Sequence, residues 1–207
     1  MNVISVTLRS LLSLVFICCA ANVSMSQTEK PSPQPSPAPR QETPATPVTP
    51  AASPADVNSI DSIVAAVYDV ISGPAGKKRD WDRMRSLFAP GARLIPTGPR
   101  QTGGYGSRNL SVEDYITRGG PSLERDGFFE SEIARKTETF GNIAHAFSSY
   151  ESRHKADEKP FARGINSLQL MNDGKRWWVV TVFWESERPD NKIPERYIGK
   201  PKPGPEL

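Results

Sequence analysis

The sequence is almost without cysteine. Cys18 and Cys19 are the only two among its 207 residues, and both lie in an apolar run close to the N-terminus. A chain cleaved after this run would contain no cysteine, which excludes a disulfide, a thiolate metal site and a cysteine nucleophile. The domain that follows must therefore be stabilised by its hydrophobic core alone.

The sequence also has few histidines and a small net charge. The two histidines, His145 and His154, would point to opposite faces of one extended strand, so they cannot chelate a metal ion together. No spacing of histidine, aspartate and glutamate resembles a metal site. The formal net charge is only +3, with both signs interspersed, which argues against nucleic acid as a partner. We expect neither a metal nor another cofactor.

The sequence also lacks an apolar run long enough to span a bilayer. The apolar run Leu11–Ala21 is short, follows the single basic residue Arg9, and precedes the small residues of Ser24-Met25-Ser26. This pattern predicts a secretory signal peptide over residues 1–26, hence export to the periplasm or beyond, and no other membrane association. An uncleaved N-terminal anchor and a lipidated cysteine are the alternatives.

Large apolar side chains are scarce in two further segments. Residues 27–55 are dense in Pro, Ser, Thr and Ala, which predicts a disordered linker. A ligand for a proline-binding module is the alternative. Residues 199–207 predict a flexible tail, which leaves residues 56–198 as one folded domain.

Within this domain, helical periodicity comes first and strand alternation follows. Apolar residues recur at helical spacing up to Ile71, with Asp56 or Asn58 as the cap, and shorter helices are predicted over 80–88 and 111–119. After residue 127 the period changes to two. The predicted strands there are Phe128–Thr139, Ile143–His154, Phe161–Met171 and Arg176–Glu187. Helices followed by an antiparallel meander predict an α+β fold with the helices on one face of a curved sheet.

Two stretches carry a resemblance to a known family. They are DWDRMRSLFAPGARLIPTG, residues 80–98, and NDGKRWWVVTVFW, residues 172–184. With the order of helices and strands, they resemble the nuclear transport factor 2-like (NTF2-like) superfamily, which includes SnoaL-type cyclases, ketosteroid isomerases and scytalone dehydratases. The resemblance implies a cone-shaped, curved antiparallel sheet wrapped around three N-terminal helices. It indicates the fold rather than an activity, since this fold hosts many activities and many non-enzymes.

Two of the three catalytic groups of the ketosteroid isomerases have a polar counterpart in this chain, and the third does not. The isomerase tyrosine matches Tyr68, and the protonated acid matches Asn166, whose amide can still donate a hydrogen bond. The base matches Ile95, which cannot accept a proton, so the isomerase mechanism as such is not expected. The scytalone dehydratase tyrosines and aspartate are also absent, because Gly76, Lys77 and Pro96 stand at their positions.

The last predicted strand, RWWVVTVFWESE, has two apolar faces. Alternation puts Trp178 and Trp184 on one face and Trp177 and Phe183 on the other. Because Trp184 matches a pocket tryptophan of the isomerases, we expect the Trp178/Trp184 face to point inward. The Trp177/Phe183 face would then form an exposed apolar patch, which predicts a homodimer through the sheet, as is common in the superfamily.

The leading hypothesis is a pocket that binds a small, largely apolar molecule. Its walls would include Trp81, Tyr150 and Trp184, and Tyr68 and Asn166 would form its polar end. A flexible glycine-rich loop, residues 101–108, would lie over the pocket mouth.

Two other functions remain open. One is a cofactor-free isomerase, dehydratase or hydrolase with a relocated base, for which Glu151, Glu185 and His145 are the strand candidates. The other is a dimeric scaffold or partner-binding domain that uses the Trp177/Phe183 face.

Overall fold

A computed structural model describes residues 49–199. The predicted signal peptide, most of the predicted linker and nearly all of the predicted tail lie outside these residues. No helix within the described range is long and apolar enough to cross a membrane. The range opens with a four-residue helix, α1 (Pro54–Val57), at the predicted border between linker and domain.

The predicted long helix is α2 (Ile60–Ile71), and the short one after it is α3 (Trp81–Leu87). Ser59 caps α2 in place of the expected Asp56 or Asn58, because its hydroxyl accepts a hydrogen bond from the Ser62 N–H at 3.0 Å.

The third predicted helix, α4 (Val112–Asp126), starts as predicted but continues well beyond residue 119. The predicted end of this helix at about residue 119 is therefore wrong. A Cβ on Gly120 would lie 2.9 Å from Cζ2 of Trp81, so the missing side chain lets α3 and α4 pack closely. This tertiary contact outweighs the weak helix propensity of glycine.

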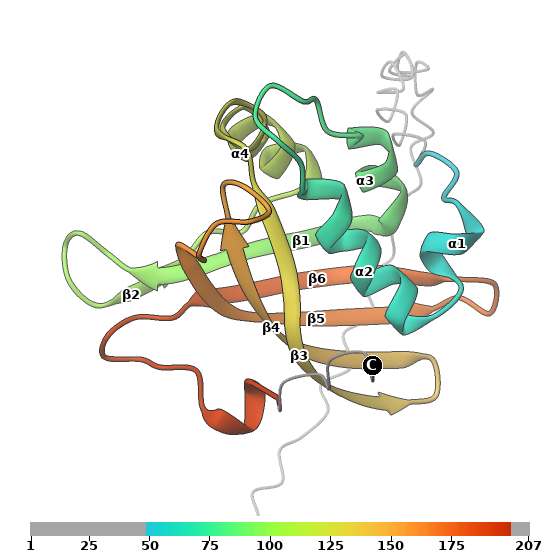
Figure 1. Ribbon diagram of the computed structural model, residues 1–207. Helices are drawn as coiled ribbons and strands as arrows, with labels where there is room; N and C mark the ends of the chain where they lie inside the picture. The colour runs from blue at the N-terminus through green and yellow to red at the C-terminus, as the bar shows by residue number, and fades with distance from the viewer. Residues whose placement is uncertain (1–48, 200–207) are drawn as a thin grey trace, which may run out of the picture. The chain divides into compact units, whose positions relative to one another are not determined.

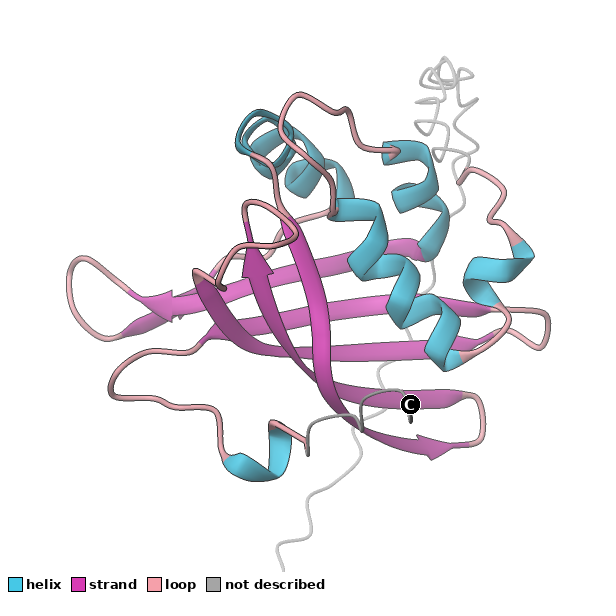
Figure 2. Cartoon of the chain, viewed as in Figure 1, coloured by secondary structure: helices cyan, strands magenta, loops and turns pink. Residues whose placement is uncertain are grey.

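Six strands form one sheet in the order β2-β1-β6-β5-β4-β3 (Figures 1 and 2). The four-strand meander is confirmed, and so is the α+β fold class. Because β1 pairs in parallel with β6, the sheet is mixed rather than wholly antiparallel. The predicted glycine-rich loop contains the short strand β2. The strand bounds are β1 (Phe88–Pro99), β2 (Tyr105–Ser107), β3 (Phe129–Phe140), β4 (Ile143–Arg153), β5 (Ala162–Asn172) and β6 (Trp177–Ser186).

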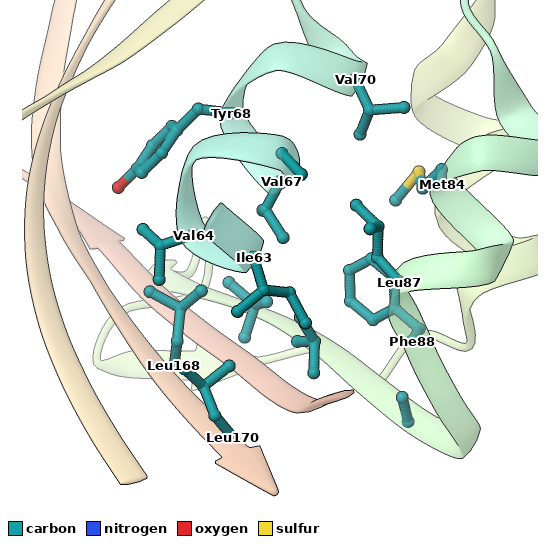
Figure 3. Packing of buried hydrophobic residues seen from close by; sticks show 14 of the residues in the cluster. Ile63, Val64, Val67, Tyr68, Val70, Met84, Leu87, Phe88, Leu168 and Leu170 are labelled. Atoms are coloured by element: carbon teal, nitrogen blue, oxygen red, sulfur yellow. The ribbon is translucent and has the colours of Figure 1, made fainter. Parts of the chain in front are cut away.

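The helices lie on the concave face of this curved sheet (Figure 1). Aliphatic side chains of α2 and α3 meet those of β5 in the core, where Ile63, Leu87 and Leu168 are fully buried. Figure 3 shows this cluster, with the Tyr68 hydroxyl directed away from its aliphatic side chains.

A β-bulge at Val180 interrupts the alternation of β6. Gln169 pairs with Thr181 and Leu170 pairs with Val179, so Val180 has no partner on β5. A bulge adds one residue to a strand, so the inward and outward positions beyond it are the opposite of those that regular alternation predicts.

The bulge corrects the predicted faces of β6. Trp177 and Trp184 both pack against the core, although simple alternation places them on opposite faces. The prediction that Trp178 points inward is wrong, because its ring lies on the other side, 3.6 Å from the guanidinium of Arg176. Phe183 lies on the outer face as expected and is 44% exposed, but Trp177 does not join it there.

Candidate functional site

A cavity of about 230 Å³ lies between the helices and the concave face of the sheet. Its walls are mostly apolar and come from helices α2, α3 and α4 and from strands β1, β3, β4, β5 and β6. Of the predicted pocket residues, Tyr150, Asn166 and Trp184 line it, whereas Tyr68 and Trp81 do not. The glycine-rich loop at residues 101–108 contributes nothing to its lining.

Trp81 joins two helices instead of facing the cavity. Its indole N–H donates to Oε1 of Glu124 at 3.0 Å, and its ring lies against Gly120. The residue therefore fixes the position of α4, which carries one wall of the cavity.

The carboxyl group of Glu130, on β3, faces the cavity. One of its oxygens accepts a hydrogen bond from Ser152 Oγ at 2.9 Å, and the other accepts one from Asn166 Nδ2 at 3.4 Å. Burial raises the pKa of Glu130 to about 7, although both hydrogen bonds act in the opposite direction. A carboxyl group with this pKa can either donate or accept a proton near neutral pH.

Sequence reasoning missed Glu130 because of a second β-bulge. The hairpin between β3 and β4 pairs Phe140 with Ile143, and regular alternation from there would direct Glu130 outward, opposite Arg153. The register shifts at Ile133, so that Glu130 pairs with Ser152 and turns to the inner face.

Tyr68 belongs to a chain of hydrogen bonds behind the cavity. Asn166 Nδ2 donates to the Tyr68 hydroxyl at 3.2 Å, and the Tyr68 and Ser148 hydroxyls are 2.7 Å apart. Ser148 donates its own proton to Glu132 at 2.5 Å, so Tyr68 must donate to Ser148. The Tyr68 hydroxyl thus donates its hydrogen bond within the protein and does not direct it to a ligand.

Two other tyrosines present hydroxyl groups to the cavity. The Tyr115 hydroxyl, on α4, has no hydrogen-bond partner among residues 49–199, and its ring packs edge-on against Trp184 with centroids 6.4 Å apart. Burial, together with nearby Glu130 and Tyr150, raises the pKa of Tyr115 above its ordinary value. The Tyr150 hydroxyl has only a long contact of 3.3 Å to Ser186, and burial raises its pKa to about 12. Both hydroxyls therefore remain protonated near neutral pH.

The strand residues predicted as a relocated base do not reach this cavity. Glu151 forms an ion pair with Arg153, and Glu185 forms one with Arg188. His145 contacts Ser167 on the outer face instead. In the part of the chain that the structure covers, no three metal-binding side chains gather in one place.

No protein-family model matches the chain, and no curated protein does. Several solved structures are similar in fold, among them the following three. A cystatin-like-fold protein of unknown function from Nostoc punctiforme PCC 73102 has 13% identity and a TM-score of 0.49, over 63% of this chain and 90% of that chain. An NTF2-like protein of unknown function from Silicibacter pomeroyi DSS-3 has 13% identity and a TM-score of 0.44, over 63% of this chain and 94% of that chain. Another NTF2-like protein of unknown function, from Shewanella baltica OS155, has 14% identity and a TM-score of 0.40, over 62% of this chain and 91% of that chain.

Proposed function

We propose that the inner cavity binds a small, largely apolar and neutral molecule, and that Glu130 exchanges a proton with it. The observation that carries the proposal is the position of the Glu130 carboxyl group. It faces an apolar cavity and is held by Ser152 and Asn166. No cofactor is required for such a step.

The electrostatics of the cavity suit proton transfer. General acid–base catalysis is most effective when the pKa of the catalytic group lies close to the working pH, and burial brings Glu130 to about 7. Within the described residues, no arginine or lysine forms an ion pair with Glu130. The apolar walls would also favour a neutral ligand over a charged one.

The hydroxyl groups of Tyr115 and Tyr150 supply the second part of the chemistry. Donors aimed at an oxygen that gains negative charge lower the barrier for removing a proton from the neighbouring carbon. Tyr115 lies close enough to Glu130 for the carboxylate charge to raise its pKa. This combination favours a small carbonyl compound as the ligand, with isomerisation, dehydration or hydrolysis as the reaction.

The test is solvent-deuterium incorporation next to the carbonyl of small ketones, followed by NMR. We expect exchange with the natural chain and a loss of about 100-fold or more with Glu130→Gln, in line with the usual contribution of an acid–base group. Glu138→Gln, an exposed position on the same strand, is the matched control. The proposal is wrong if no ketone binds in the cavity, or if Glu130→Gln exchanges as fast as the control.

We propose self-association through the sheet as a second candidate function. Phe140, Ile143, Met171 and Trp178 occupy one line across β3 to β6, since each pairs with the next. Phe140 is 84% exposed and Ile143 is 59% exposed, which is the kind of patch that marks an interface. Sedimentation of the natural chain and of Phe140→Ser/Ile143→Ser tests this, and a natural chain that stays monomeric at high concentration would refute it.

We also propose export, on the basis of residues 1–26 alone. The N-terminal residue of the chain recovered from the extracytoplasmic fraction would then be Gln27. An N-terminus at Met1 in that fraction would instead support the uncleaved anchor.

A further inference from the structure

The chain crosses the outer face of the sheet after β6 ends. We call residues 187–198 the C-terminal strap; it includes the short helix η1 (Glu195–Tyr197) and lies on the side away from the helices (Figure 1). The backbone carbonyl of Tyr197 accepts a hydrogen bond from Ser149 Oγ at 2.6 Å, and the Tyr197 ring packs edge-on against Phe147. Ile193, in the middle of the strap, is buried. The strap is therefore anchored near its end and at its middle.

A second cavity, of about 360 Å³, lies between the strap and the sheet. Its floor is formed by outward side chains of β1, β4, β5 and β6, including Thr97, Phe147, Ile165 and Phe183. Phe183 lines this cavity together with residues of the strap and keeps an exposed fraction of 44%. The strap thus leaves room for an apolar group on an apolar floor.

The charges around this second cavity are unevenly paired. Its two acids are engaged, since Glu185 pairs with Arg188 and Glu187 accepts a hydrogen bond from the Ile193 N–H at 3.2 Å. Its two cations, Lys192 and Arg196, are exposed, and no carboxylate of residues 49–199 pairs with either, although the Arg196 guanidinium lies 4.7 Å from the centre of the Tyr197 ring. A positive rim without carboxylate partners, above an apolar floor, is complementary to a molecule with a negative head and an apolar body.

We infer that the strap cavity binds a single-chain anionic amphiphile of the fatty-acid type. Its carboxylate would lie near Lys192 and Arg196, and its alkyl chain would cover Phe183 and Ile165. This site is separated from the inner cavity by the sheet and does not depend on the function proposed for Glu130. Only β6 residues, Trp184 and Ser186, line both cavities.

The test uses decanoate as the probe, with binding measured by calorimetry and located by amide chemical shifts. We expect one molecule per chain, with shifts concentrated in residues 183–197. Lys192→Gln/Arg196→Gln should weaken binding about tenfold, and added salt should weaken binding to the natural chain, because exposed charges are screened. Phe183→Ser should also weaken it about tenfold, through lost apolar contact. Decanol, which lacks the charge, should bind the natural chain as weakly as decanoate binds the charge variant.

Lys175→Gln/Arg118→Gln removes the same amount of charge elsewhere on the surface and should leave decanoate binding unchanged. Three results would overturn the inference. They are no saturable binding, equal affinity in the Lys192/Arg196 variant and the control, or shifts centred on the inner cavity at Val67 and Tyr115. The charge variants alter only exposed side chains, so they remain informative even if Phe183→Ser fails to fold.

Discussion

Asn166 Nδ2 lies 3.4 Å from a carboxylate oxygen of Glu130, and Asn166 directs its other amide hydrogen to Tyr68. One residue thus connects the cavity carboxyl to the polar chain behind it. The expected match with ketosteroid isomerases has an acid at position 166, where this chain has an amide. The amide donates to Glu130, which an ionised carboxylate could not do.

Replacing that amide by a carboxyl group should change how Glu130 titrates. Two carboxyl groups this close cannot both ionise easily, so Asn166→Asp should hold one of them protonated to a pH above that of the natural site. Carbon-13 NMR of the side-chain carboxyl groups measures the two apparent pKa values. Asn142→Asp, in the exposed β3–β4 turn, is the control and should titrate as an ordinary aspartate. Two ordinary pKa values in Asn166→Asp would contradict the geometry.

Glu130 should make the stability of the domain depend on pH. Its folded pKa is raised from 4.5 to about 7, so this contribution is fully present below pH 4.5 and is lost as pH rises toward 7. Allowing for solvent in the cavity, the loss is on the order of 2 kcal/mol in the free energy of unfolding. Urea unfolding at pH 5 and pH 8 measures it, and Glu130→Gln should remove this part of the difference. An equal pH dependence in both proteins would show that the carboxyl group is not buried.

Two tyrosine substitutions should separate a structural hydroxyl from a functional one. Tyr68→Phe breaks the chain from Asn166 to Ser148 and should lower the free energy of unfolding by about 1–3 kcal/mol, because buried partners are left unpaired. Tyr115→Phe removes a hydroxyl without a partner in the described chain and should cost under about 0.5 kcal/mol.

The same two variants should rank in the opposite order for proton exchange. If Tyr115 donates to the ligand oxygen, Tyr115→Phe should slow deuterium incorporation by about 100-fold. Tyr68→Phe should slow it much less, since the Tyr68 proton is directed to Ser148. Equal effects of the two variants on both measurements would contradict the assignment.

Arg79 should be a strong determinant of stability. It is 7% exposed, and its guanidinium donates to the backbone carbonyls of Ile71, Gly73 and Leu123 at 3.0, 2.6 and 3.0 Å. Lysine cannot reproduce this planar set of donors, so Arg79→Lys should cost about 2–4 kcal/mol in urea unfolding. Arg118→Lys, at an exposed position, should cost almost nothing. A small effect at Arg79 would mean that the connection between α2 and α3 can rearrange.

The elements that were predicted well are those that local periodicity determines. The apolar spacing of α2 and the alternation of β3 to β6 follow from side-chain direction in regular structure, so their bounds were close. The predictions that were wrong concern features that depend on contacts between residues far apart in the sequence. Two bulges, at Ile133 and Val180, each reversed the faces of a strand, so Glu130 was missed and Trp178 was placed on the wrong side. Neither bulge contains a glycine or a proline that would have indicated it in the sequence.

The site was predictable only in part for the same reason. Tyr150, Asn166 and Trp184 line the cavity because they lie on regular stretches of their strands. The helix that carries Tyr115 was predicted, but Tyr115 has no spacing that distinguishes it from other helix tyrosines. Its place in the cavity lining follows from how α4 packs against the sheet, which no local pattern reveals.

The parallel pairing of β1 with β6 has a consequence for the order of folding. Phe88 pairs with Val179, so two strands from opposite ends of the domain are neighbours in the middle of the sheet. Among the described strands, β6 alone joins the β1–β2 pair to the β3–β5 meander. A ribosome-bound chain that ends before residue 177 lacks β6 and could not join the β1–β2 pair to strands β3–β5. Such long-range pairing predicts slow, late completion of the fold, only after the final strand has been synthesised.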